Sequence, residues 1–121
     1  MRHLAFHLKR GQRAERKARD FLIRNGLRHI DSNYRCPCGE LDLVMEDGEH
    51  VVFVEVRYRN NDRFGGALAS IDSQKQKKLR ASAEHYRQRH KPLSNRPCRF
   101  DVIALTGDIN SVDPKWIKDA F

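Results

Sequence analysis

Cysteine is scarce in this sequence, and the few residues present do not form a metal-binding pattern. There are three among 121 residues, an odd number that leaves at least one thiol without a partner inside the chain. Cys36-Pro37-Cys38 has no second pair of ligands nearby, and His29 and His50 alone do not complete a four-ligand zinc site. We therefore expect reduced structural thiols rather than zinc ligands, with Cys98 as a small buried hydrophobe.

Long hydrophobic runs are also missing. No segment approaches the roughly 20 apolar residues that a membrane-spanning helix needs. The apolar stretch within residues 1–10 is too short for a secretory signal peptide. These absences disfavour a membrane protein and a secreted protein, and a cytoplasmic location is expected.

The composition that remains is typical of one soluble globular domain. Hydrophobic residues make up 39% of the chain and charged residues 33%, which is too apolar a balance for a disordered protein. A length of 121 residues is sufficient for one modest hydrophobic core, and no repeat or linker interrupts the chain. We expect a single domain over residues 1–121.

The net charge of +8 is distributed unevenly along the chain. Residues 1–30 carry nine Lys or Arg against two acids, and residues 74–91 carry seven against one. Residues 31–73 show the reverse, with nine acids against four bases. Basic flanks attract a polyanion such as nucleic acid by neutralising its phosphates, but solvated helix faces have the same composition. Charge alone leaves both interpretations open.

Hydrophobic periodicity and turn residues predict an alternation of helices and strands. Asn25-Gly26 favours a helix end, and Asp72 or Ser73 can cap a second helix with an apolar stripe of Leu79, Ala83 and Tyr86. The predicted elements are a helix over 12–25, strands over 27–34, 40–46 and 49–59, a polar loop over 60–66, a helix from 72 or 73 to about 90, and a strand over 98–105. This α-β-β-β-α-β order predicts an α/β fold with a mixed central sheet flanked by helices.

The segment 39–59 is predicted to be a β-hairpin, because Asp47-Gly48 separates two apolar runs. Counting outward from this two-residue loop pairs Glu40 directly with Glu55. Strand side chains alternate between the two faces of a sheet, so the hairpin gathers four charged side chains on one face. These are Glu40, Asp42, Glu55 and Arg57.

Three carboxylates on one face of a sheet repel one another unless a cation compensates them. Magnesium prefers oxygen ligands from a few carboxylates with water and phosphate, and it can activate water or stabilise a phosphoryl group. The pattern therefore predicts a Mg²⁺ site for phosphate chemistry, with Mn²⁺ as the alternative ion. The competing interpretation is an exposed hairpin rim on which Arg57 simply offsets the charge of Glu55.

The same residues carry a resemblance to a known family. Gly39–Val44 followed by Val52–Arg57 resembles the YraN-like family of uncharacterised bacterial proteins. Further matches, in order along the chain, are Ala14-Glu15, Asn33-Tyr34-Arg35, Arg63-Phe64-Gly65, Lys75, Arg99-Phe100-Asp101-Val102 and Ala120-Phe121. That family is similar to the PD-(D/E)XK nuclease superfamily, which includes archaeal Holliday-junction resolvases. The resemblance implies a restriction-endonuclease-like core and makes Asp42 the first metal-binding acid, Glu55 the second and Glu15 a further acid.

One position departs from the family pattern, which has a lysine where this chain has Arg57. That lysine is thought to orient or deprotonate the attacking water. Arginine stays protonated, so it can hold a phosphate but cannot act as a base. Lys75 either supplies an ammonium group from another direction or is one solvated lysine of a basic helix. Cleavage is therefore left open, while metal and phosphate binding are expected.

Two other acids are expected to have supporting roles. Glu40 is interpreted either as a structural acid or as an acid that contacts the metal ligands without binding the metal itself. Asp101 lies in the middle of a predicted strand, where acids are uncommon. We expect it to hydrogen-bond to Arg99, to a backbone group or to a basic residue near the site, and not to bind metal.

The leading hypothesis is a magnesium-dependent endonuclease that hydrolyses phosphodiester bonds in branched or structured DNA. Basic residues of both helices would contact the DNA backbone, namely Arg13, Arg16, Lys75, Lys77 and Lys78. No base-reading motif is present, so binding without sequence specificity is expected, and RNA is not distinguished from DNA. The alternatives are a non-cleaving nucleic-acid-binding module of the same fold, in DNA processing or uptake, and a protein-interaction scaffold with basic helices. A homodimer is compatible with each hypothesis, but the sequence does not establish one.

Overall fold

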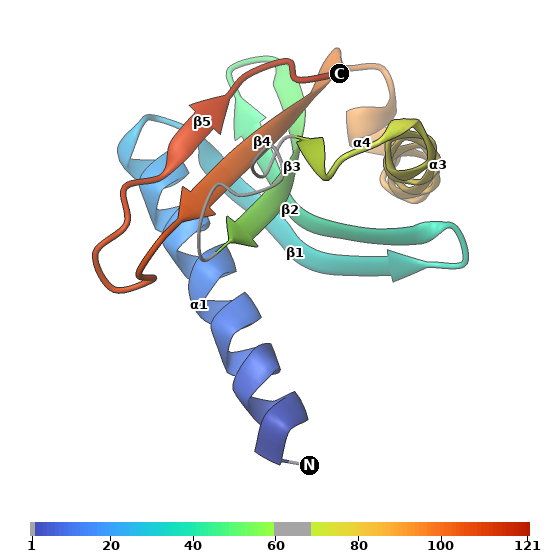
Figure 1. The fold of residues 1–121 in the computed structure, drawn as a ribbon. Coiled ribbons are helices and arrows are strands. Elements are labelled where there is room, and N and C mark those ends of the chain that lie inside the picture. Colours follow the sequence, from blue (N-terminus) through green and yellow to red (C-terminus); the bar gives the residue numbers. More distant parts are fainter. Residues whose placement is uncertain (1, 60–68) are drawn as a thin grey trace.

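The computed structural model describes the backbone of residues 2–59 and 69–121, and the side chains from residue 11 onward in those ranges. The polar loop expected over 60–66 therefore lies outside the described residues. Figure 1 shows a single sheet with a long helix on either side. The helices are α1 (Arg2–Arg24), α3 (Ser73–Arg89) and the short α4 (Lys91–Ser94). The strands are β1 (Arg28–Cys36), β2 (Gly39–Asp47), β3 (His50–Arg59), β4 (Cys98–Thr106) and β5 (Lys115–Ile117).

The sheet is mixed, as predicted, with the strand order β1-β2-β3-β4-β5. Strands β3 and β4 pair in parallel, and the other neighbours pair antiparallel. A parallel pair needs a long crossover, and α3 lies between β3 and β4 in the chain. The expected order of the main elements is confirmed. Two short elements were not predicted, α4 with four residues and β5 with three, because neither is long enough to show a hydrophobic period.

The two long helices cover opposite faces of the sheet and create two cores. Helix α1 packs its stripe of Ala14, Ala18 and Leu22 against one face. Helix α3 packs Leu79, Ala83 and Tyr86 against the other, so both predicted stripes are confirmed. Burial of these stripes, more than helix propensity, holds the helices in place.

The helix ends follow the capping residues in the sequence. The Asp72 side chain accepts a hydrogen bond from the Lys75 backbone N–H at 2.8 Å and so caps α3. At the end of α1, Gly26 has a φ of +96°, and the N–H of Leu27 bonds back to the carbonyl of Leu22 at 3.1 Å. Helix α1 begins at Arg2, well before the predicted start.

The β2–β3 hairpin exists, but its predicted register is wrong by two residues. Asp47 pairs with His50, so the two loop residues are Gly48 and Glu49 rather than Asp47 and Gly48. Gly48 adopts a φ of +58°, and a glycine at the first loop position suits a two-residue hairpin. Because the shift is an even number of residues, the paired residues 43–47 and 50–54 keep their expected faces.

Strand β2 changes face in the middle, next to an irregular residue of β1. Leu41 packs in the α3-side core and Leu43 in the α1-side core, although regular alternation would put both on one face. The break falls at Asp42. On β1, Asn33 lies between the pairs Ser32↔Leu43 and Tyr34↔Leu41 and adopts a φ of +55°. Asparagine tolerates this left-handed conformation better than most residues.

The three cysteines are free thiols, as predicted. The expectation that Cys98 is buried is wrong, since it is half-buried at the edge of the α3-side core. The cause is its position as the first residue of β4, where packing from the preceding turn covers only part of the side chain.

Candidate functional site

Asp42 and Glu55 face each other where β2 separates from β3. In the described residues the β2–β3 ladder starts at Leu43↔Val54, so one further step would place Asp42 opposite Glu55. The Asp42 Oδ2 atom instead accepts a hydrogen bond from the Val56 backbone N–H at 2.9 Å. A second hydrogen bond joins the carboxyl groups of Asp42 and Glu55 directly. The structure thus brings together the two acids that the sequence singled out.

The environment of this pair disfavours two negative charges. Burial raises the pKa of Glu55 to about 8, and the charge of Asp42 adds to this, while Lys75 and Arg57 counteract it. Burial also raises the pKa of Asp42, with Glu40 acting in the same direction and the Val56 N–H opposing it. Two buried carboxyls in contact hold one proton between them at neutral pH unless a cation replaces it.

Two basic side chains border Glu55, which is only 6% exposed. The Arg57 Nε atom lies 3.5 Å from Glu55 Oε1, and the Lys75 Nζ atom lies 4.0 Å from the same oxygen. In the described part of the structure, the buried Nε of Arg57 has no hydrogen-bond partner. Arg57 extends from β3 and Lys75 from the first turn of α3. Sequence reasoning had placed Lys75 chiefly on a DNA-binding helix face, whereas the fold brings it to the carboxylates.

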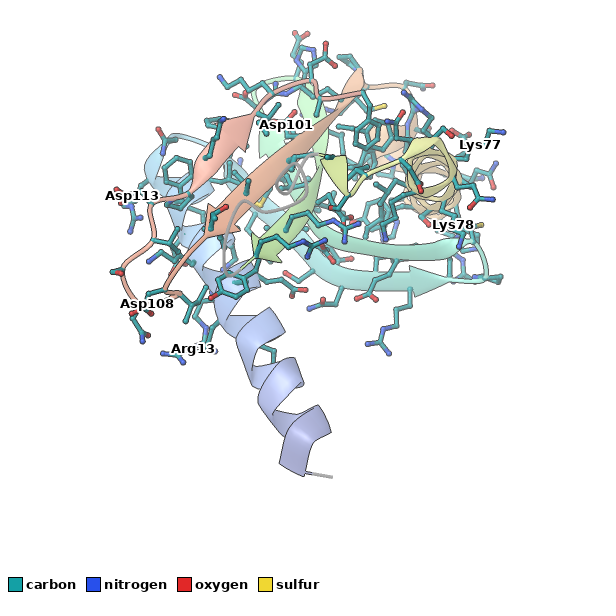
Figure 2. The ribbon with its side chains drawn as sticks, in the orientation of Figure 1. Arg13, Lys77, Lys78, Asp101, Asp108 and Asp113 are labelled. Atoms are coloured by element: carbon teal, nitrogen blue, oxygen red, sulfur yellow. The ribbon has the colours of Figure 1, made fainter. Side chains whose placement is uncertain are left out.

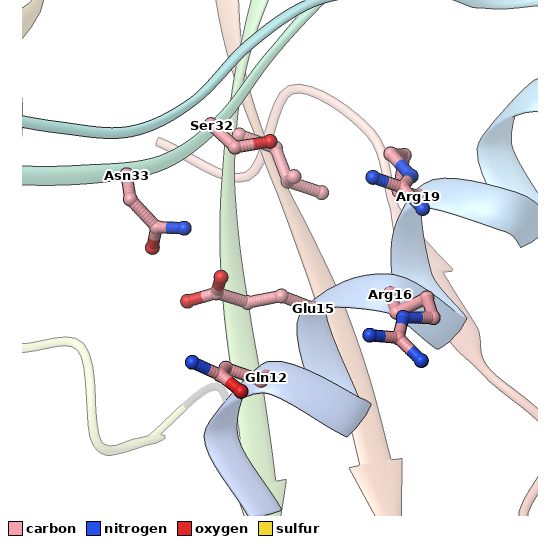
Figure 3. A pocket seen from close by; sticks show the side chains of 7 residues that line it. Gln12, Glu15, Arg16, Arg19, Ser32 and Asn33 are labelled. Atoms are coloured by element: carbon pink, nitrogen blue, oxygen red, sulfur yellow. The ribbon is translucent and has the colours of Figure 1, made fainter. Parts of the chain in front are cut away.

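Glu15 reaches the same region from α1. Burial raises the pKa of Glu15 to about 7, and the charges of Asp42 and Glu40 add to the rise, while a hydrogen bond from Asn33 opposes it. Figure 3 shows Glu15 extending toward Asn33, with Gln12 beside it. These residues border an open cavity of about 330 Å³ whose lining also includes Arg16, Arg19, Ser32 and Leu43.

Glu40 does not lie across from Glu55, because the corrected register places it too far along β2. Its partner is Arg35 on β1, with 3.9 Å between Arg35 Nε and Glu40 Oε2. Glu40 still acts on the site through its charge, which raises the pKa of both Asp42 and Glu15.

Asp101 has the structural role that the sequence suggested, and its bond to Arg99 is confirmed. The carboxylate is fully buried, with Oδ1 accepting from Arg99 Nε at 3.0 Å and from the Asp119 backbone N–H at 2.9 Å. Its Oδ2 accepts from Trp116 Nε1 at 2.9 Å. Asp101, labelled in Figure 2, therefore fastens the C-terminal segment to β4.

The basic residues expected to contact DNA do not form one patch. Figure 2 places Arg13 at one side of the molecule and Lys77 and Lys78 at the other, on α3. Arg13 is held by a hydrogen bond to Asn110, whereas Lys77 and Lys78 are exposed. Arg16 is also exposed and borders the cavity next to Glu15.

The donor set fits a hard cation with few protein ligands. Within the described residues, no group of three or more His, Cys, Asp or Glu side chains is arranged as a metal site. Two neighbouring carboxylates are present, and magnesium is commonly held by one or two carboxylates with water and phosphate completing six oxygens. The missing soft ligands argue against zinc at this position.

Comparison with known proteins places the chain in a family. The model of the uncharacterised protein family UPF0102 matches residues 14–105. The chain belongs to this family. UPF0102 is the YraN family, so the resemblance seen in the sequence is confirmed at that level. The matched range contains Glu15, Asp42 and Glu55.

Full-length relatives from the UPF0102 family are similar to this chain. A UPF0102 protein of Nitrosococcus oceani is 47% identical over 117 residues, covering 97% of this chain and 94% of the relative. One from Pseudomonas syringae is 52% identical, covering 92% of this chain and 91% of the relative. Among the described residues, no helix is long and apolar enough to cross a membrane.

Two contributors to the site were missed by sequence reasoning. One is the backbone N–H of Val56, because no side-chain pattern reports a backbone donor. The other is Asn33, which bonds to Glu15 and lies beside the break in β2. Its signal was an asparagine inside a strand-like run, a residue type that tolerates positive φ.

Proposed function

We propose that this UPF0102 protein is a cytoplasmic, metal-dependent nuclease that hydrolyses phosphodiester bonds in structured or branched DNA. The observation that supports it most is the buried pair of Asp42 and Glu55, hydrogen-bonded to each other next to Arg57 and Lys75. Such a pair is costly unless a cation or a proton compensates it. Perturbed carboxyls of this kind concentrate at functional sites.

In this proposal Asp42 and Glu55 hold Mg²⁺ or Mn²⁺ through carboxylate oxygens. The bound cation would supply a water of lowered pKa and neutralise charge on the phosphate. The Val56 N–H fixes the Oδ2 atom of Asp42 and so holds this carboxylate beside Glu55. Because the ion displaces the proton shared by the pair, binding is expected to strengthen as pH rises.

Arg57, Lys75 and Glu15 have different tasks around this pair. Arg57 donates to the phosphate through its guanidinium, which also forms an ion pair with Glu55. Lys75 supplies a second positive charge from α3. Glu15 approaches from the opposite side of the pair and accepts a proton near neutral pH, since its pKa is about 7.

DNA is held by its backbone and not by its bases. Arg16 continues the positive charge from the cavity beside Glu15, and Lys77 and Lys78 continue it along α3. Because Arg13 lies on one side of the molecule and Lys77 and Lys78 on the other, we do not expect a straight duplex to contact all three (Figure 2). A bent or branched substrate with several arms fits this distribution better.

The test is cleavage of labelled flap, four-way-junction and single-stranded DNA with and without Mg²⁺. We expect metal-dependent cleavage by the wild type, and loss of at least a hundredfold in rate for Glu55→Gln. Glu84→Gln is the matched control, since Glu84 is an exposed acid on α3 whose nearest cation is Arg87 at 3.7 Å. Equal cleavage by wild type and Glu55→Gln would contradict the proposal.

A second candidate is a DNA-binding module that does not cleave, in DNA processing or uptake. Arg57 is the observation that favours it, since arginine cannot deprotonate water. The two candidates differ in their response to magnesium. The module would bind DNA with a strong salt dependence, would bind equally with Mg²⁺ or EDTA, and would leave every substrate intact.

A further inference from the structure

The turn between β1 and β2 brings two thiols together. Cys36 pairs with Gly39, and Pro37 and Cys38 are the two residues between them. The side chains of Cys36 and Cys38 are hydrogen-bonded to each other. Residues two apart in a turn have Cα atoms within the roughly 4.4–6.8 Å that a disulfide spans. Both side chains are only partly buried, so small solutes can reach them.

The Cys36 sulfur is surrounded by hydrogen-bond donors. The backbone N–H groups of Cys38 and Gly39 and the hydroxyl of Ser82 on α3 are close enough to lower the pKa of this thiol. Ser82 is fully buried, and in the described part of the chain its hydroxyl has no hydrogen-bond partner of regular geometry. The turn lies against it, because a Cβ added at Gly39 would come within 3.1 Å of Ser82 Oγ. A buried hydroxyl without a regular partner therefore lies against the turn that carries both thiols.

The two thiols differ in acidity. Partial burial alone would raise the pKa of Cys36, but the hydrogen bonds from Ser82, Cys38 and Gly39 together lower it below its ordinary value. The pKa of Cys38 is raised, chiefly because its thiol is hydrogen-bonded to Cys36. Cys36 is thus the better nucleophile, and Cys38 retains a proton beside it.

We propose that Cys36 and Cys38 form a peroxide-sensitive dithiol, with Cys36 as the attacking sulfur and Cys38 as the resolving one. The Cys36 thiolate attacks one oxygen of a hydroperoxide, forming an S–O bond and breaking the O–O bond. The leaving oxygen takes a proton and departs as water or an alcohol. The Cys38 sulfur then attacks the Cys36 sulfenic acid, the S–S bond forms, and a second water leaves with the Cys38 proton. The two thiols together lose two electrons, and the peroxide gains both of them.

This site is separate from the carboxylate pair and does not rest on the proposed nuclease function. It also changes the interpretation of the cysteines as inert structural thiols. Cys98 provides an internal comparison, because it is half-buried at the start of β4, outside the turn that carries Cys36 and Cys38.

The experiment treats the reduced full-length protein with hydrogen peroxide and follows its intact mass and its peptides. We expect loss of two hydrogen atoms, a peptide with Cys36 and Cys38 linked, Cys98 still free, and full reversal by dithiothreitol. Cys38→Ser is expected to stop at a sulfenic acid on Cys36, which dimedone traps. Cys36→Ser is expected to slow thiol oxidation at least tenfold, to the rate of Cys98.

Ser82→Ala tests the environment of the sulfur. It removes one donor from a buried position without adding volume, and alkylation of Cys36 by iodoacetamide at pH 7 is expected to slow several-fold. Cys98→Ser is the control. We expect it to change neither the rate at which peroxide oxidises Cys36 nor the rate at which iodoacetamide alkylates it. The proposal is overturned if Cys98 reacts as fast as Cys36, if the disulfide joins two chains, or if Cys36→Ser oxidises at the wild-type rate.

Discussion

The Asp42 carboxylate accepts the backbone N–H of Val56 at 2.9 Å, so a side chain occupies a position that a strand carbonyl would fill in a regular ladder. The Asp42 side chain thus gives the Val56 N–H a hydrogen-bond acceptor where β2 separates from β3. It also fixes Asp42 against Glu55, since the same separation brings the two carboxyls together. The irregularity of the sheet and the formation of the site therefore have one cause, and the following predictions test its consequences.

The first prediction concerns pH and stability in the absence of divalent metal. The folded-state pKa of Glu55 is raised to about 8, so the stability it contributes is complete below its unfolded value of 4.5 and is lost as pH rises through 8. We expect the free energy of unfolding to fall by on the order of 3 kcal/mol between pH 5 and pH 9. Glu55→Gln is expected to remove most of this fall, and Glu84→Gln to leave it unchanged. Urea unfolding at a series of pH values in EDTA measures it, and parallel curves for wild type and Glu55→Gln would contradict it.

The second prediction concerns magnesium. A cation that replaces the proton shared by Asp42 and Glu55 competes with it, so binding is favoured at high pH. We expect millimolar Mg²⁺ to raise the melting temperature by a few degrees at pH 8.5 and by much less at pH 6. Asp42→Asn is expected to abolish the shift at both pH values. An equal shift in the variant would mean that magnesium binds elsewhere.

The third prediction concerns Asn33. This residue adopts a φ of +55°, where alanine is strained and glycine is not. Asn33→Ala is therefore expected to be less stable than Asn33→Gly by about 1 kcal/mol, as measured by chemical denaturation. Both variants lose the side-chain hydrogen bond from residue 33 to Glu15, which lowers the pKa of Glu15. We therefore expect both to raise this pKa above about 7. Equal stability of the two variants would argue against the left-handed conformation.

Sequence reasoning recovered the elements that have a long hydrophobic period and missed what depends on contacts between them. The stripe of Leu79, Ala83 and Tyr86 was sufficient to place α3 correctly. The hairpin loop was displaced by one residue at each end because Asp-Gly and Gly-Glu are both acceptable loops, and Arg96 helps to select between them. Its guanidinium donates to the carbonyl of Gly48 at 2.8 Å and to that of Glu49 at 2.9 Å. These two residues lie 48 and 47 positions before Arg96 in the sequence.

The site itself was only partly accessible to such reasoning. Asp42 and Glu55 were identified from the predicted hairpin and from the family resemblance, and the two-residue register error still leaves them beside each other. For Lys75 the sequence left open whether it reaches this site or is a solvated lysine, since its contact with Glu55 depends on how the crossover helix docks on the sheet. The break in β2 was also hidden, because its cause is the conformation of one asparagine on the neighbouring strand.

The fourth prediction concerns Asp101. Removing this fully buried carboxylate takes from Arg99 one of its two acidic partners, the other being Asp47 at 2.8 Å, and frees the segment around Trp116. We expect Asp101→Ala to destabilise the protein by about 3–5 kcal/mol, the cost of breaking a buried ion pair. Asp113→Ala, at an exposed acid of the same region, is expected to change stability by less than about 0.5 kcal/mol. Trp116 is the single tryptophan of the chain, so its fluorescence reports the transition directly.

The fifth prediction separates the two candidate functions through Arg57. Lysine at this position keeps the positive charge near Glu55 and adds a group that can lose its proton when desolvated. If metal-bound water needs a base, Arg57→Lys is expected to raise the cleavage rate several-fold at pH 8 while the affinity for junction DNA changes by less than threefold. Arg57→Ala is expected to weaken DNA binding and to cleave more slowly than either. Single-turnover cleavage and binding titrations at fixed salt measure both quantities. A binding module would show the affinity changes alone, with no cleavage by Arg57→Lys at any pH, and that result would replace the nuclease proposal with the second candidate.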